Sequence, residues 1–277
     1  LHNACRALVE DGVDGILVTL ITDGIESLAS KLAEIVRFRE QDELARRVIA
    51  GFHVEGPFLN PSPGFIGAHE PLCVRPANVD DAQRLLDAGA GLVKLFTLAP
   101  EQDAGSAVTH FLAGQGVVVS AGHCDPTLNQ MKAAIDNGLS MVTHFGNGCP
   151  VELPRHDNVL QRYLSLREHL WFCFIPDGAH IDFIALKNYL DFVGIDRSIM
   201  TTDAISAAKL GPGLYEISGI SVEVDEAGVA RRPGSPNLAG STITMPGVRR
   251  NLSESLGLGE DEITSLVDLN PRAALPL

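Results

Sequence analysis

Short apolar runs rich in β-branched residues alternate with stretches of helical periodicity along most of this 277-residue chain. Seven runs are typical of buried strands, at residues 15–20, 48–54, 91–98, 117–121, 140–144, 170–175 and 198–202. Because helical patterns follow most of them, we expect a parallel sheet covered by helices. The sequence therefore predicts an α/β fold that is one strand short of a (β/α)8 (TIM-type) barrel.

The regular alternation ends near Gly211. Residues 215–224 alternate between apolar and polar side chains, and residues 225–228 have the composition of a turn. This pattern predicts a β-hairpin at about residues 213–232. Because no internal repeat or long linker is visible, we assign residues 1–277 to one barrel domain that carries this inserted hairpin.

Charge and cysteine content exclude several classes of protein. Twenty-one basic and thirty-five acidic residues give a formal charge of −14, which makes nucleic acid and anionic membranes poor partners. No apolar run approaches the ~20 residues of a membrane span, and the first residues lack a secretory signal. Five cysteines without a CxxC pair favour a reduced, cytoplasmic setting. The chain has no initial Met, so we expect it to be part of a longer protein.

Polar side chains stand at the carboxyl ends of five predicted strands, where the chemistry of a parallel barrel takes place. The positions are His53 with Glu55, His123, His144, Asp177 with His180, and Asp203. Taken singly, a histidine there is more often a hydrogen-bonded structural residue than a ligand, and Glu55 or Asp203 can simply cap a turn. Because strand ends meet at one mouth of a barrel, the joint pattern favours a metal site with an attached acid or base.

The residue types also suggest the metal. One carboxylate and two imidazoles leave open positions on Zn²⁺ or Fe²⁺ for water and substrate. His53 and Glu55 share a face of a regular strand, and we favour a supporting role for His53 over that of a ligand. We interpret Cys124 as a buried, inert thiol rather than a thiolate ligand.

Seven segments carry a family resemblance. They read HVEGPFLNPSPGFIGAHEP, KLFTLAPE, SAGHCDPT, THFGNGCP, IPDGAHID, TTDA and AGSTITM. In this order they resemble the N-acetylglucosamine-6-phosphate deacetylases of the amidohydrolase superfamily. The resemblance runs from about Leu17 to the end of the chain and implies a metal-dependent hydrolase barrel.

The resemblance implies roles for individual positions. Glu55 of HVEGP, His123 of AGH and His144 of THFGN resemble the metal ligands, and Asp203 of TTDA resembles the catalytic aspartate. The positions that resemble substrate contacts are His69, Asn147, Gly148, Arg155 and His180. Among these, the 147–148 backbone and the arginine correspond to the groups that meet the substrate phosphate.

Three features depart from the family pattern. The opening strand with its HxH-type motif and the segments of a small β-sandwich are absent, so we expect a barrel without its first strand and without that second domain. The run Gly146–Cys149 replaces a commoner aromatic-Asn-Ala-Met run, which loosens the wall near the sugar. The surroundings of Arg155 also differ, and we interpret His156 as solvent-facing or helix-capping rather than phosphate-binding.

The pattern and the resemblance together predict hydrolysis of the N-acetyl group of an amino-sugar phosphate, from N-acetylglucosamine 6-phosphate to glucosamine 6-phosphate and acetate. The expected cofactor is a divalent metal, zinc in preference to iron. The alternatives are an amidohydrolase for another N-acyl sugar, a non-catalytic sugar-phosphate-binding paralogue and, less favoured, an aldolase that uses Lys94. We expect the small-molecule substrate, not nucleic acid or membrane, as the partner, and the resemblance implies a homodimer.

Overall fold

The computed structural model describes residues 1–277 with the exception of Ser218, Pro236 and Leu277. The chain forms two compact units. The first comprises Leu1–Thr143, Gly148–Trp171 and the residues from Arg272 onward, and the second comprises His144–Asn147 and Phe172–Pro271.

The first unit is built on five parallel strands whose order in the sheet follows the chain. They are β1 (Ile16–Ile21), β2 (Ile49–Glu55), β3 (Val93–Leu98), β4 (Val118–Ala121) and β5 (Leu139–Val142). Phe52, Phe96 and Val119 are fully buried on them. The five apolar runs predicted from the sequence are confirmed as strands. Four of them are largely buried, as such runs require, whereas β1, at the end of the strand order, is buried only at Leu20.

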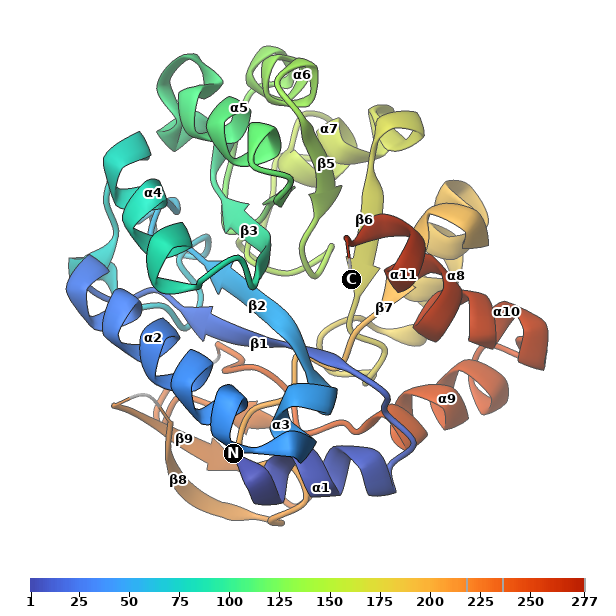
Figure 1. Ribbon diagram of the computed structural model, residues 1–277. Coiled ribbons are helices and arrows are strands. Elements are labelled where there is room, and N and C mark those ends of the chain that lie inside the picture. Colours follow the sequence, from blue (N-terminus) through green and yellow to red (C-terminus); the bar gives the residue numbers. More distant parts are fainter. Residues whose placement is uncertain (218, 236, 277) are drawn as a thin grey trace. The chain divides into compact units, whose positions relative to one another are not determined.

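Helices cover the sheet of the first unit, and Figure 1 shows α2, α4 and α5 as successive neighbours along its outer side. The helices are α1 (His2–Glu10), α2 (Ile25–Gln41), α3 (Glu43–Val48), α4 (Val79–Ala88), α5 (Ala107–Gly114), α6 (Leu128–Asp136) and α7 (Val159–Ser165), with short turns η1 (Pro71–Cys73), η2 (Pro100–Gln102), η3 (Ala104–Ser106) and η4 (Arg167–His169). The N-cap of α6 is Thr127. Its side chain and that of Gln130 form a reciprocal capping box.

The strand register sets the carboxyl ends of β1 to β4 at one level. Ile21 of β1 lies opposite Glu55, and Glu55 lies opposite Thr97 of β3. Thr97 in turn lies opposite Ser120 of β4. Loops that leave these strands therefore start at the same edge of the sheet, which is where a parallel sheet carries its site.

The second unit has two parallel strands, β6 (Trp171–Phe174) and β7 (Ser198–Met200). Its helices are α8 (Phe183–Val193), η5 (Ile195–Arg197), α9 (Met245–Glu254), α10 (Glu260–Thr264) and the π-helical turn η6 (Ser265–Leu269), and the chain ends with α11 (Asn270–Ala274). An aromatic cluster forms its core. The ring of Phe145 packs edge-to-face against Phe172 and Tyr189, at centroid distances of 5.2 and 4.9 Å.

The predicted hairpin is a three-stranded antiparallel sheet. Its strands are β8 (Gly213–Ile217), β9 (Ile220–Val224) and β10 (Ala230–Arg231), in the order β10-β9-β8. The predicted turn at residues 225–228 lies between β9 and β10, but a second turn divides residues 215–224, because Ile217 pairs with Ile220. Gly219, at φ +79°, supplies the left-handed backbone of that turn; Ser218 lies outside the described residues.

The fold class is α/β, with seven parallel strands among the described residues and helices between them. The described residues do not form a closed eight-stranded barrel. The assignment of residues 1–277 to one barrel domain stays a prediction. Among the helices that the structure describes, none has the length and apolar character needed to cross a membrane.

Candidate metal centre

Three side chains of the first unit meet where β2 ends. They are Glu55, the last residue of β2, His69 on the loop that follows, and His123 just after β4. The Nε2 atom of His123 lies 3.3 Å from Oε1 of Glu55, and the Nε2 atom of His69 lies 3.9 Å from the same oxygen. All three residues are buried. The family resemblance predicts Glu55 and His123 as ligands and His69 as a substrate contact.

The contacts of the His123 ring determine which ring nitrogen carries the proton and which one presents a lone pair to Glu55. Nδ1 lies 2.7 Å from the carbonyl oxygen of Phe65. A carbonyl only accepts hydrogen bonds, so Nδ1 carries the proton of the neutral ring and Nε2 is left with its lone pair. Such an arrangement is the usual support of a metal-binding histidine.

The loop backbone comes close to this ring at Gly67. A Cβ atom built on Gly67 would lie 2.8 Å from Cε1 of His123, and the glycine has a φ of +58°. Both the space and the backbone conformation therefore require glycine here. The loop that carries His69 therefore packs against His123. The two imidazole rings meet edge to face, with their centroids 4.3 Å apart.

Thr22, just after β1, connects His69 to Glu55. Its hydroxyl donates a 3.3 Å hydrogen bond to the carbonyl oxygen of Glu55 and lies 2.9 Å from Nδ1 of His69. The backbone N–H of Thr22 donates to the same Nδ1 atom at 3.3 Å, so Nδ1 is an acceptor and the Nε2 atom of the neutral ring carries the proton on the side of Glu55. Sequence reasoning missed Thr22, although it follows a predicted strand and the rule used for the other strand ends applied to it as well.

The spacing of these donors fits a divalent cation. Two atoms at about 2.0–2.2 Å from one tetrahedral ion lie roughly 3.3–3.6 Å apart. The Glu55–His123 distance of 3.3 Å is within that range and the Glu55–His69 distance of 3.9 Å is slightly longer. The one-carboxylate, two-imidazole donor set also suits zinc or iron.

His53 does not join this cluster and is hydrogen-bonded inside the sheet. Its Nε2 atom lies 2.7 Å from Oγ1 of Thr97, and its Nδ1 atom lies 3.3 Å from Oγ1 of Thr19. The Thr97 hydroxyl continues to Thr143 at 2.7 Å, and Thr143 continues to Ser120 at 2.6 Å. Because both ring nitrogens of His53 take part in these contacts, the geometry favours structural support over metal ligation for this residue.

The predicted residues of the second unit have their own local geometry. His180 donates from Nδ1 to Asp177 Oδ2 at 2.7 Å, and Asp177 also accepts from the backbone N–H of Ala179 and His180. Burial raises the pKa of the Asp177 carboxyl, but these hydrogen bonds outweigh it and hold that pKa below its usual value. Asp177 is therefore an anion that orients the His180 ring.

Three predicted site residues share an uncommon backbone conformation. His123, His144 and Asp203 have φ values of 51°, 33° and 48°, in the left-handed region that non-glycine residues seldom adopt. Such strain concentrates at functional sites. Because His144 and Asp203 belong to the second unit, the joining of His144 to Glu55 and His123 stays a prediction.

The predicted phosphate-binding residues lie on the loop between β5 and α7. The backbone N–H of Asn147 donates to the carbonyl oxygen of His144 at 3.0 Å. Arg155 and His156 are exposed, which agrees with the solvent-facing interpretation of His156. The residue that caps α7 is Asn158, whose side chain accepts from the N–H of Gln161. A role of Gly148 toward substrate also stays a prediction.

Cys124 is buried next to His123. Its Sγ lies 2.7 Å from the hydroxyl of Tyr163, and burial raises the pKa of the thiol well above its usual value. Cys124 is therefore a neutral thiol, as the sequence predicts. All five cysteines are free.

The chain is similar to curated proteins over nearly its whole length. It is 28% identical over 267 residues to the N-acetylglucosamine-6-phosphate deacetylase of Bacillus subtilis, covering 95% of this chain and 66% of that protein. It is also 28% identical over 265 residues to the N-acetylgalactosamine-6-phosphate deacetylase of Escherichia coli O157:H7, covering 96% of this chain and 68% of that protein. No family model matches the chain.

A solved structure decides the relationship. A mutant N-acetyl-D-glucosamine-6-phosphate deacetylase from Mycobacterium smegmatis, in complex with N-acetyl-D-glucosamine-6-phosphate, matches with a TM-score of 0.88 and 30% identity, over 100% of this chain and 74% of that one. The chain belongs to the N-acetylglucosamine-6-phosphate deacetylase family. This family lies in the amidohydrolase superfamily, as the seven sequence motifs predict.

Membership in the deacetylase family also bears on the alternatives. The named reaction of these relatives is removal of an acetyl group, which needs no Schiff-base lysine, so the aldolase alternative built on Lys94 loses its support. This chain spans about two thirds of the length of the curated deacetylases it matches. A second deacetylase structure, from Thermotoga maritima, matches with a TM-score of 0.86 and 25% identity, over 97% of this chain and 70% of that one.

Proposed function

We propose that this protein hydrolyses the N-acetyl group of N-acetylglucosamine 6-phosphate to give glucosamine 6-phosphate and acetate. The observation that carries the proposal is the buried pair of Glu55 and His123, with a fixed histidine tautomer and ligand atoms 3.3 Å apart. The names of the relatives point to the same chemistry. The chain spans about two thirds of the length of these relatives, so the activity of the whole relatives is a proposal for this chain.

The proposed ligands are Glu55, His123 and His144, a donor set that suits zinc or iron, and we propose zinc as the metal. A bound divalent cation supplies Lewis-acid polarisation of the acetamido carbonyl and acidifies a water. The Nε2 atom of His69 lies 3.9 Å from Oε1 of Glu55 within the same cluster, and we propose that His69 contacts the substrate rather than the metal. A His144→Gln variant that loses zinc while His69→Gln retains it supports this ligand set, and the reverse result assigns His69 as the third ligand.

Two further residues move and orient groups in the proposed reaction. Asp203 accepts the proton of the water that adds to the carbonyl carbon and returns it to the nitrogen as the C–N bond breaks. His180, held by the anionic Asp177 through Nδ1, presents Nε2 to the substrate and orients the acetamido oxygen or a sugar hydroxyl. The catalytic role belongs to the aspartate, and the histidine positions the substrate.

The phosphate is the part of the substrate that this acidic protein must recognise locally. We propose that the backbone at Asn147 and Gly148 and the guanidinium of Arg155 contact it. Arginine can clamp a phosphate through two parallel N–H bonds. The exposure of Arg155 leaves its side chain accessible to a ligand.

A second substrate has an observation in its favour. The Escherichia coli relative at 28% identity is an N-acetylgalactosamine-6-phosphate deacetylase, and the run Gly146–Cys149 departs from the commoner pattern beside the sugar. A galactosamine substrate would require the same metal, the same Asp203 and the same phosphate contacts. A non-catalytic paralogue is disfavoured because the proposed ligands and Asp203 are all present.

The proposal also covers the barrel architecture, the oligomeric state and the cellular location. We propose that the seven parallel strands are part of a (β/α)8 barrel, supported by the match to deacetylase structures. A homodimer follows from the family resemblance. A cytoplasmic location is supported by five free cysteines.

Acetate release from three substrates side by side tests the proposed function. We expect turnover of N-acetylglucosamine 6-phosphate to exceed that of the unphosphorylated sugar, with N-acetylgalactosamine 6-phosphate as the discriminating third. Arg155→Met should raise KM about 10-fold or more for the phosphorylated sugars and leave the unphosphorylated one unchanged. His156→Gln is the matched control and should change neither. Equal turnover of phosphorylated and unphosphorylated sugars would remove the phosphate from the proposal.

A further inference from the structure

The segment that carries His123 needs support from outside itself. His123 follows β4 with a left-handed φ of 51°, a conformation that costs a non-glycine residue about 1–2 kcal/mol. The next three residues lead to α6, whose N-cap is Thr127. Something must hold residues 123–125 in place if the ring is to stay directed at Glu55.

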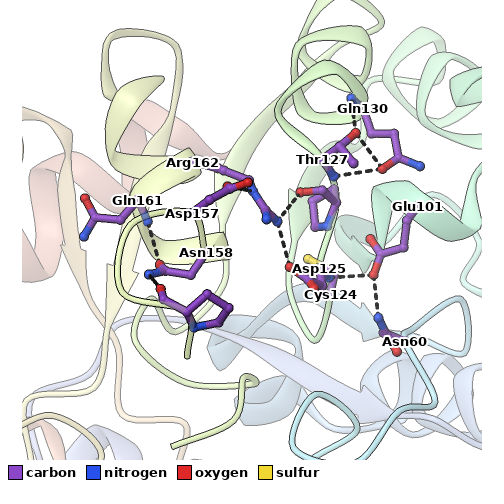
Figure 2. Close-up of polar contacts among 12 residues, drawn as sticks. Asn60, Glu101, Cys124, Asp125, Thr127, Gln130, Asp157, Asn158, Gln161 and Arg162 are labelled. Carbon is purple, nitrogen blue, oxygen red and sulfur yellow. Dashed lines mark hydrogen bonds and ion pairs between the residues drawn. The ribbon is translucent and has the colours of Figure 1, made fainter. Parts of the chain in front are cut away.

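Glu101, on the turn η2 after β3, is the centre of that support. Its Oε1 accepts a 2.6 Å hydrogen bond from the backbone N–H of Asp125 and a 2.9 Å bond from the side-chain amide of Asn60. The backbone N–H of Asn60 in turn donates to the carbonyl oxygen of His123 at 2.9 Å. Figure 2 shows the two bonds to Oε1 of Glu101. Together with the backbone bond from Asn60 to His123, they close a ring of contacts around the metal-ligand segment.

The other contacts of the segment attach it at different points. Tyr163 holds the Cys124 side chain, and Arg162 donates to Asp125 Oδ1 at 2.7 Å and to the Pro126 carbonyl at 2.9 Å. Figure 2 shows Arg162 on the side of Asp125 opposite to Glu101. Neither of these contacts reaches the His123 backbone, whereas the ring through Glu101 and Asn60 includes it.

The second carboxylate oxygen of Glu101 shows that burial of this side chain is energetically unfavourable. Oε2 is buried and has no hydrogen-bond partner. Burial raises the pKa of Glu101 in spite of the hydrogen bonds from Asp125 and Asn60. A buried oxygen without a partner is destabilising, so stability alone is a poor reason for a glutamate here.

We infer that Glu101 is a positioning residue for metal binding, holding residues 123–125 so that the His123 lone pair faces Glu55. The inference rests on the proposed function, because it takes His123 as a ligand. It concerns the acceptor oxygen of the side chain, which a glutamine can also supply. A merely structural role would affect folding stability and leave metal affinity unchanged.

The test measures zinc affinity, by competition with a chromophoric chelator, together with the melting temperature of the metal-free protein. Glu101→Ala removes the acceptor and should weaken zinc binding about 10- to 100-fold, the usual cost of losing a residue that orients a ligand. Glu101→Gln keeps an acceptor oxygen and should stay within about threefold of the wild type, since only the charge contribution is lost.

Asp103→Ala is the matched control. Asp103 is a buried carboxylate of the same stretch of chain, and it accepts from the N–H of Val108 and Thr109 at the start of α5. Its loss should lower the melting temperature without changing zinc affinity, because the hydrogen bonds that it accepts come from the start of α5. If Glu101→Ala does not fold, Asn60→Ala decides: it removes one donor from the ring and should also weaken zinc binding several-fold.

The outcomes distinguish failure of the inference about Glu101 from failure of the proposed function. Wild-type zinc affinity in Glu101→Ala, or in Asn60→Ala where that variant decides, would overturn the inference and leave the proposed function standing. Zinc binding as weak in Glu101→Gln as in Glu101→Ala would also overturn it, because the acceptor oxygen would then not be the cause. A wild-type protein that binds no zinc or iron would instead overturn the proposed function.

Discussion

His123 shows how a single position is made suitable for metal binding. Its left-handed backbone turns the side chain away from the direction that a regular strand would give, and the Phe65 carbonyl fixes the proton on Nδ1. Gly67 lets the loop backbone reach the ring. The orientation of the lone pair is therefore built by residues distant in the sequence, none of which is itself a ligand.

Gly67→Ala tests the close approach of the loop. A Cβ atom 2.8 Å from Cε1 of His123 forces the ring or the loop to move, so zinc affinity should fall about 10-fold or more. Gly116→Ala is the control, because Gly116 has a φ of +76° but nothing within 4 Å of an added Cβ. Both variants should lose about 1–2 kcal/mol of unfolding free energy through backbone strain. Equal zinc affinities in the two variants would contradict the packing argument.

Asp203→Asn tests the proposed general base. The variant keeps the shape of the side chain and removes the proton acceptor, so kcat should fall by about 10² or more, while zinc content and KM stay near those of the wild type. If the residue only caps a turn, the variant should instead lose roughly 0.5–2 kcal/mol of stability with turnover per folded molecule unchanged. Acetate release per bound metal, measured beside a thermal melt, distinguishes the two.

At the scale of elements, a layer of buried hydroxyls and one imidazole crosses the strands beneath the candidate site. Thr97 of β3 is its centre, with His53 and Thr143 each 2.7 Å from its hydroxyl. These contacts tie the strand that ends in Glu55 to the residue that precedes His144. The layer thus connects β2 to the end of β5.

Thr97→Val should show how much this layer contributes. Valine fills the same volume but leaves the buried His53 and Thr143 without the shared partner, so the free energy of unfolding in urea should fall by about 1–3 kcal/mol. Thr19→Val is the control: Thr19 is exposed and its contact with His53 is longer, 3.3 Å, so its loss should cost about 0.5 kcal/mol or less. Equal stabilities of Thr97→Val and the wild type would show that the layer is energetically neutral.

Most elements of this fold can be predicted from the sequence, because strands buried on both faces leave continuous apolar runs. The hairpin shows the limit: residues 215–224 alternate as one strand would, and only a left-handed glycine within them marks the turn. The candidate site shows the same limit. Glu55 and His123 follow from their places at strand ends, whereas His69 and Glu101 reach the site through loops and turns whose paths no periodicity reveals.

At the scale of the whole molecule, the charge of −14 opposes an anionic substrate at long range. Recognition of a sugar phosphate must therefore come from local groups, of which Arg155 is the proposed one. The fold match to a deacetylase that binds such a ligand, at a TM-score of 0.88, is consistent with a site of this kind. The central claim is that acetate release depends on a metal held by Glu55.

The most direct measurement is a zinc titration of the metal-stripped protein, following acetate release from N-acetylglucosamine 6-phosphate. We expect no release without metal and a rise in proportion to bound zinc until the site is saturated. Glu55→Gln should remain inactive at zinc concentrations that saturate the wild type, because it loses the anionic ligand. Undiminished acetate release by the metal-free protein, or full reactivation of Glu55→Gln, would contradict the account.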